Sequence, residues 1–178
     1  NKSDQAMRAY SKAIELKPDY AEAHKNLALV HQQLERYEEA VASFQQAISL
    51  APNDIESPMR LADLLRGRAR YAEAVVNYQR VIELAPDTAE AHNNLAICLK
   101  EQGCFSEAIT AQTRALTLAP EAVDFHINMA GILQSQGTLP EAMTTCQQAI
   151  KLNPENANAS SSLACVQRDA GQIDDAII

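Results

Sequence analysis

Apolar residues recur along the chain in paired runs that have helical spacing, and residues 89–122 give the clearest example. The first run places His92, Leu95, Ala96 and Leu99 on one helical face. The second run consists of Phe105, Ala108, Ile109, Ala115, Leu116 and Leu118. Gly103 separates the runs and can take the left-handed backbone conformation that ends many helices. Pro120 ends the second run, because proline cannot continue the hydrogen-bond ladder. The stretch therefore predicts a helix, a turn, a second helix and another turn.

The same pattern returns every 34 residues, as the prolines that close each unit show. These prolines end the phrases AIELKP, AISLAP, VIELAP, ALTLAP and AIKLNP, and they are Pro18, Pro52, Pro86, Pro120 and Pro154. A fixed period of this size is typical of stacked repeats and not of one globular core. We therefore expect a solenoid in which each repeat contacts its neighbours.

Small residues recur in phase with this period. One column, in the first helix, contains Ala28, Ala62, Ala96, Ala130 and Ala164. A second column, in the second helix, contains Ala6, Ala40, Ala74, Ala108, Ala142 and Ala176. A third contains Ala13, Ala47, Val81, Ala115 and Ala149. Close helix crossings need small side chains at the contact, so we expect these columns in the interior.

The period divides the chain into whole and partial repeats within one solenoid over residues 1–178. Residues 1–20 match a second helix only, and the whole repeats are residues 21–54, 55–88, 89–122 and 123–156. Residues 157–178 repeat a first helix, a turn at Gly171 and the start of a second helix at Ala176. In residues 55–88 we expect the first helix to begin at Ser57 or Pro58. Neither end of the chain carries a polar cap, which predicts a longer parent chain and end-to-end association.

The period, the recurring Leu-Ala pair, the alanine columns and the closing proline together resemble the tetratricopeptide repeat. The pair occurs as Leu27-Ala28, Leu61-Ala62, Leu95-Ala96 and Leu163-Ala164. The resemblance implies an all-α fold, a right-handed superhelix of antiparallel helix pairs. It also implies that the first helices line a concave groove that binds a protein or peptide.

In the groove that the resemblance implies, the sixth residue of each repeat faces inward. This column reads Asn26, Arg60, Asn94, Asn128 and Ser162. Asparagine offers donors and an acceptor to a peptide backbone, and the column resembles the asparagine ladder of protein O-linked glycosyltransferases, as do the phrases AEAHNNLA and KEQG. Lys25, Arg60, Arg66 and Lys100 form a candidate basic strip for an acidic peptide. The alternative for these charges is that they complement helix dipoles.

Composition narrows the class of partner. The net charge of −8 argues against nucleic acid, where a basic face supplies most of the affinity. No apolar run approaches the ~20 residues of a membrane span. The cysteines Cys98, Cys104, Cys146 and Cys165 lack CxxC spacing, so we expect reduced helix residues in a reducing, cytoplasmic compartment.

Neither a metal site nor a catalytic site is predicted. His24, His92 and His126 share the fourth position of their repeats, and such positions lie ~8–10 Å apart or more, too far to share one zinc ion. We expect packed or partly exposed interhelical histidines there and at His31. No catalytic or phosphate-binding motif is present, so we expect no cofactor. Two hypotheses remain, a non-catalytic interaction scaffold and the substrate-recognition arm of a larger O-linked glycosyltransferase.

Overall fold

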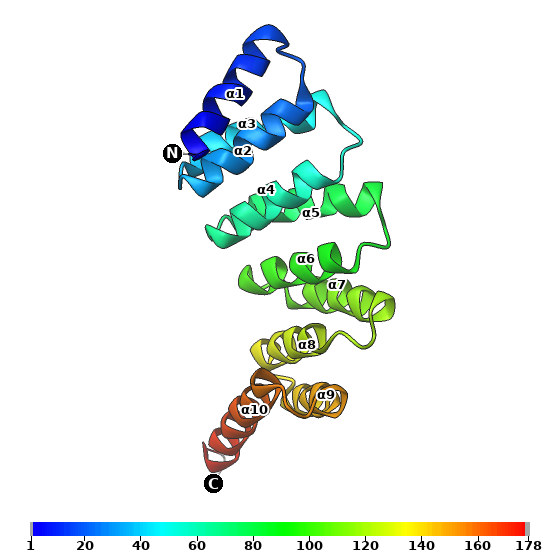
Figure 1. The fold of residues 1–178 in the computed structure, drawn as a ribbon. Coiled ribbons are helices and arrows are strands. Elements are labelled where there is room, and N and C mark those ends of the chain that lie inside the picture. The colour runs from blue at the N-terminus through cyan, green and yellow to red at the C-terminus, as the bar shows by residue number, and fades with distance from the viewer. Residues whose placement is uncertain (1, 177–178) are drawn as a thin grey trace. The chain divides into compact units, whose positions relative to one another are not determined.

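The computed structural model describes residues 2–176, with side chains as far as residue 171. Over this range the chain forms ten helices and no strand (Figure 1). The helices are α1 (Lys2–Leu16), α2 (Ala21–Gln33), α3 (Tyr37–Leu50), α4 (Glu56–Gly67), α5 (Tyr71–Leu84), α6 (Ala89–Glu101), α7 (Phe105–Leu118), α8 (Val123–Gln136), α9 (Leu139–Leu152) and α10 (Ala157–Ala176).

The helices fall into two compact units, Asn1–Pro86 and Asp87–Ile178. In the first unit each helix packs on the next from α1 to α5, and in the second the same holds from α6 to α10. The first helices of the second unit also contact one another, since α6 packs on α8 and α8 on α10. One continuous solenoid over both units stays a prediction.

The turns inside the repeats share one backbone geometry, which recurs every 34 residues. Its left-handed residues are Glu35 (φ 58°), Ala69 (φ 58°), Gly103 (φ 77°) and Gly137 (φ 91°). At Gly103, its N–H donates to the Lys100 carbonyl (2.9 Å) and the Cys104 N–H donates to the Leu99 carbonyl (2.9 Å). The equivalent bonds occur in the other three turns, so each turn is a Schellman motif. Gly103 was predicted to take the left-handed conformation between two helices, and this geometry confirms it; Gly137 occupies the same position one period later.

The alanine columns lie mostly in the interior, as predicted. Ala28, Ala62, Ala96, Ala40, Ala74, Ala108, Ala142 and Ala115 are each fully buried, at 0% exposure. The prediction is wrong for Ala164, which is exposed on α10, because that helix buries Ala159 and Val166 instead. Ala6 and Ala13 are only half-buried. The side chain of Ala176 lies outside the described residues.

Two helix boundaries differ from the prediction. Helix α4 begins at Glu56 and not at Ser57 or Pro58, because the Asp54 carboxylate accepts hydrogen bonds from the Glu56 and Ser57 N–H groups (3.1 and 3.0 Å). Helix α10 continues through Gly171, where a turn and a second helix were predicted. Glycine permits the left-handed conformation without requiring it, and a helical glycine costs only roughly 0.5–1 kcal/mol.

Candidate peptide-binding surface

A hollow of about 480 Å³ lies on the first helices of the first unit. Leu29, Gln32 and Gln33 line it from α2, and Arg60 lines it from α4. The Arg60 side chain is 55% exposed, and its guanidinium lies 3.7 Å from the Glu56 carboxylate. One apolar contact, two amides and a largely exposed cation are thus brought together. Such a lining is able to hold a side chain and to hydrogen-bond a peptide backbone.

The predicted groove residue Lys25 is held in an ion-pair network that ties α2 to α4. Its Nζ lies 2.9 Å from Glu22 and 2.8 Å from Glu56, and its side chain is only 14% exposed. Hydrogen bonds to Glu56 and Glu22 raise the pKa of Lys25 above its ordinary value. Asn26 donates to Glu22 across 3.2 Å. In this state Lys25 therefore links two helices of the first unit instead of offering an unpaired charge.

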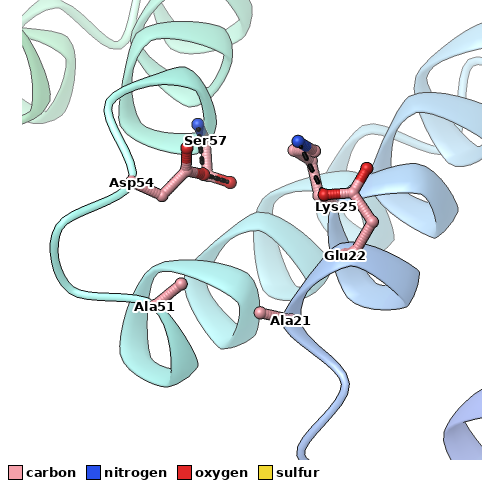
Figure 2. A pocket seen from close by; sticks show the side chains of 6 residues that line it. All are labelled: Ala21, Glu22, Lys25, Ala51, Asp54 and Ser57. Carbon is pink, nitrogen blue, oxygen red and sulfur yellow. Dashed lines mark hydrogen bonds and ion pairs between the residues drawn. The ribbon is translucent and has the colours of Figure 1, made fainter.

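This network borders a smaller hollow of about 210 Å³ at the N-terminal ends of α2 and α4 (Figure 2). Asp54 lies on its far side and caps α4 through its hydrogen bonds to Ser57. Burial alone would raise the pKa of Asp54. The hydrogen bonds from Ser57 and Glu56 and the nearby positive charge of Lys25 outweigh burial, so the pKa of Asp54 lies below its ordinary value. Each charged group here already has a structural partner within the unit.

The remaining members of the predicted basic strip also have local partners. The Arg66 Nε donates to the hydroxyl of Tyr78 across 3.2 Å, and that hydroxyl donates to Asp63 across 2.7 Å. Arg66 thus supports a tyrosine whose ring is fully buried. Lys100 lies in the second unit, 3.1 Å from Glu101. The four cations of the strip therefore belong to three local networks, because Lys25 and Arg60 both lie close to the Glu56 carboxylate.

In the second unit, the asparagines of the predicted ladder belong to a network of four amide side chains. Asn128 Nδ2 on α8 donates to Asn93 Oδ1 on α6 across 2.9 Å. Gln112 Nε2 on α7 donates to the same oxygen across 3.0 Å and to the Phe125 carbonyl across 2.7 Å. Asn93 Nδ2 donates to Asn94 Oδ1 across 3.1 Å. The network brings Asn94 and Asn128, two predicted site residues, together through Asn93.

Sequence reasoning missed Asn93 and Gln112 as members of this site. Gln112 lies where two other repeats carry the buried aromatic residues Phe44 and Tyr78. Gln112 is fully buried at 0% exposure, and Asn93 is 6% exposed. The available signal was Asn93, which directly precedes the predicted Asn94 and lies in the same repeat as an amide, Gln112, at a position that is aromatic in other repeats.

Two of the histidines at the fourth repeat position, His24 and His126, contact the segments that connect the repeats. His24 Nε2 lies 3.0 Å from the Pro18 carbonyl, and His126 Nε2 lies 2.8 Å from the Pro120 carbonyl. Both side chains are half-buried, which agrees with the prediction of packed or partly exposed interhelical histidines. Burial lowers the pKa of His31, whose buried Nδ1 has no hydrogen-bond partner among the described residues. Among those residues no cluster of His, Cys, Asp or Glu suits a metal ion.

Family comparisons agree with the helix pairs. Models described as tetratricopeptide or TPR repeats match residues 1–35, 21–54, 54–121, 99–157 and 145–178. Together these matches extend over residues 1–178, and they confirm that the chain is built from tetratricopeptide repeats. A sequence search of curated proteins finds no match.

Solved structures of other TPR proteins share the fold. YrrB, described as a TPR protein with an unusual peptide-binding site, has 23% identity and a TM-score of 0.82, with 91% of this chain and 84% of YrrB covered. A MamA structure has 21% identity and a TM-score of 0.80, covering 87% of this chain and 91% of MamA. MamA from Desulfovibrio magneticus RS-1 has 19% identity and a TM-score of 0.80, covering 88% and 89%. These likenesses confirm the all-α TPR solenoid class.

Proposed function

We propose that the chain is a non-catalytic interaction scaffold that binds an extended peptide or a partner helix on its first helices. The observation that carries this proposal is the hollow formed by Leu29, Gln32, Gln33 and Arg60. Its volume of about 480 Å³ lies within the range of ~300–1,000 Å³ that is usual for ligand pockets.

The polarity of the surface favours a peptide over a small apolar ligand. Amide side chains recur on the first helices of both units, at Gln32 and Gln33 in one and at Asn94 and Asn128 in the other. Amides donate to peptide carbonyls and accept from peptide N–H groups without reading side chains. YrrB, whose fold this chain shares, is described as having a peptide-binding site, which supports the same class of ligand here.

The proposal is tested with a peptide selected on the chain from a random library. We expect Arg60→Ala, and separately the double variant Asn94→Ala with Asn128→Ala, to lower affinity at least fivefold in isothermal titration calorimetry. Arg8→Ala on the exposed face of α1 is the matched control and should bind like the wild type. Undiminished binding by Arg60→Ala and by the double variant, with unchanged circular dichroism, would contradict the assignment of the first helices.

A second candidate is the substrate-recognition arm of a larger protein O-linked glycosyltransferase. The phrases AEAHNNLA and KEQG and the column containing Asn26, Asn94 and Asn128 favour it. The test is peptide sequencing of the native protein beyond Ile178, together with its intact mass. A sugar-nucleotide-binding domain on the same polypeptide supports this candidate, and a polypeptide made of repeats alone contradicts it.

We propose a cytoplasmic location, which the cysteines support. None of the four cysteines, which all lie among the described residues, forms a disulfide, and Cys98 and Cys146 are fully buried at 0% exposure. Cys104 was predicted to lie inside a helix, but it lies in the turn before α7. Among the described helices, none is both long and apolar enough to cross a membrane. Fractionation of cells with an antibody to the chain tests the location directly.

A further inference from the structure

Gln112 occupies a position where the other whole repeats carry a residue that needs no hydrogen bond to a neighbouring repeat. The column reads Phe44, Tyr78, Gln112 and Cys146, and all four side chains are fully buried at 0% exposure. The fifth position of the repeats reads Lys25, Met59, Asn93 and Ile127. Among the four whole repeats, only the third combines a buried amide in the column of Phe44 with an asparagine at the fifth position.

The hydrogen bonds of Gln112 fix the orientation of every amide in the network. A backbone carbonyl only accepts hydrogen bonds, so the bond to the Phe125 carbonyl identifies the Gln112 nitrogen. That nitrogen also donates to Asn93, whose oxygen must then face it. The same Asn93 oxygen accepts from Asn128 Nδ2. The orientation of Asn128 thus follows step by step from one backbone group on its own helix.

The network determines the direction of the Asn128 side-chain carbonyl oxygen, Oδ1. Because Nδ2 is turned toward Asn93, Oδ1 is turned away from the network. Among the described residues Oδ1 accepts no hydrogen bond. It is also absent from the buried polar atoms that lack a partner, so it is not fully buried. Asn128 is half-buried, so its oxygen keeps access to solvent. The network therefore presents an acceptor, and not a donor, from this helix.

The network carries a visible cost. Gln112 Oε1 is buried and has no hydrogen-bond partner among the described residues. An unsatisfied buried acceptor destabilises the fold, whereas an apolar side chain of similar shape would not. Stability alone would favour an apolar residue at this position, as Phe44 illustrates. A buried polar group that is retained despite such a cost is consistent with a role in positioning a neighbouring group.

We infer that Gln112 and Asn93 are positioning residues that hold Asn128 as a hydrogen-bond acceptor for a backbone N–H of an extended peptide bound along α6 and α8. This inference rests on the proposed function and adds the polarity of one contact to it. The specified partner group is an amide hydrogen of a peptide main chain, so the contact is independent of the sequence of side chains. Gln112→Met removes the fixed orientation while keeping an unbranched side chain of similar length.

The experiment uses the full chain and a peptide selected on it from a random library. A series of versions of that peptide, each N-methylated at one backbone nitrogen, identifies the N–H group that donates a hydrogen bond to Asn128. In the wild type we expect one N-methylation to reduce affinity about tenfold, the equivalent of one hydrogen bond of ~1.4 kcal/mol. In Gln112→Met the unmodified peptide should bind about five- to tenfold more weakly, and that N-methylation should cost little more. The melting temperature of this variant should be unchanged or higher.

The controls separate this inference from the proposed function. Gln147→Met makes the same change on the exposed surface of α9 and should leave both affinity and the N-methylation profile unchanged. Equal affinity and an identical profile for Gln112→Met would overturn the positioning role while leaving peptide binding intact. Failure to select any peptide would contradict the proposed function and this inference with it.

A ligand-free measurement tests the orientation itself. The Asn128 side-chain NH₂ group donates to a nearly buried oxygen, so its hydrogens should exchange slowly with solvent in nuclear magnetic resonance spectra. Gln112→Met should accelerate that exchange at least tenfold. Fast exchange in the wild type would contradict the network, whatever the peptide experiments show.

Discussion

Replacing Ala69 by glycine should stabilise the chain, because Ala69 holds a left-handed backbone conformation (φ 58°) at the end of α4. The left-handed conformation costs a residue with a Cβ atom roughly 1–2 kcal/mol. Glycine avoids that cost, but its greater conformational freedom stabilises the unfolded chain by about 0.4–1 kcal/mol. The expected net gain for Ala69→Gly is therefore about 0.5–1 kcal/mol.

The reverse change at the equivalent turn should have the opposite sign. Gly103 has φ 77°, and a Cβ atom added there would meet no other atom within 4 Å. The loss in Gly103→Ala therefore contains no steric clash, only backbone strain offset by the lower freedom of alanine in the unfolded chain. We expect it to match the gain at Ala69 in size. Both changes are read from urea unfolding followed by circular dichroism. For a chain of this size, each kcal/mol corresponds to a shift of about 2–4 °C in melting temperature.

A control distinguishes turn geometry from a general effect of glycine. Ala42 lies on the exposed side of α3, within the same unit. Ala42→Gly should destabilise by roughly 0.5–1 kcal/mol, as expected for glycine inside a helix. If Ala69→Gly is as destabilising as Ala42→Gly, the description of the turns as strained left-handed caps is wrong.

Three further predictions follow from burial and charge. Ala108→Leu should cost ~1–3 kcal/mol of unfolding free energy, because Ala108 is fully buried at a helix crossing; an unchanged urea midpoint would contradict that. Asp54→Ala should cost ~1 kcal/mol at pH 7 through the lost cap. The folded-state pKa of Asp54 is lowered, so its contribution is full above the unfolded pKa of about 3.9 and is lost as pH falls through the folded value; a difference between variant and wild type that persists at pH 2 would refute this. End-to-end association should appear as a mass that rises with concentration in light scattering, and Leu16→Glu, at a leucine that is 77% exposed, should reduce it; a constant monomer mass would exclude it.

The repeat fold was predictable because its signals are local and recur in phase. The spacing of Ala28, Ala62 and Ala96 identified helix interiors, and Gly103 marked a turn. The period alone also locates the turns at Glu35 and Ala69, where no glycine signals them, since both lie a multiple of 34 residues from Gly103. Local signals failed where packing decides the outcome. Gly171 lies one period after Gly137, yet α10 passes through it.

The candidate site was predictable only in part, because its contacts cross between helices. The sixth-position column identified Asn94 and Asn128, but it gave no reason to link them through Asn93. Gln112 lies 19 residues from Asn93, and Asn128 lies 35 residues from it. These separations become contacts only when α6, α7 and α8 pack together. The same limit applies to Lys25, whose charge suggested a ligand contact, whereas its ammonium group pairs with Glu56 on another helix.

The most direct test of the proposed scaffold is to map the binding face on the native chain. Backbone amide shifts are followed by nuclear magnetic resonance while a library-selected peptide is titrated into the wild-type protein. The account predicts the largest shifts on the first helices, α2 and α4 in one unit and α6 and α8 in the other. Shifts confined to the second helices α3, α5, α7 and α9 would contradict it.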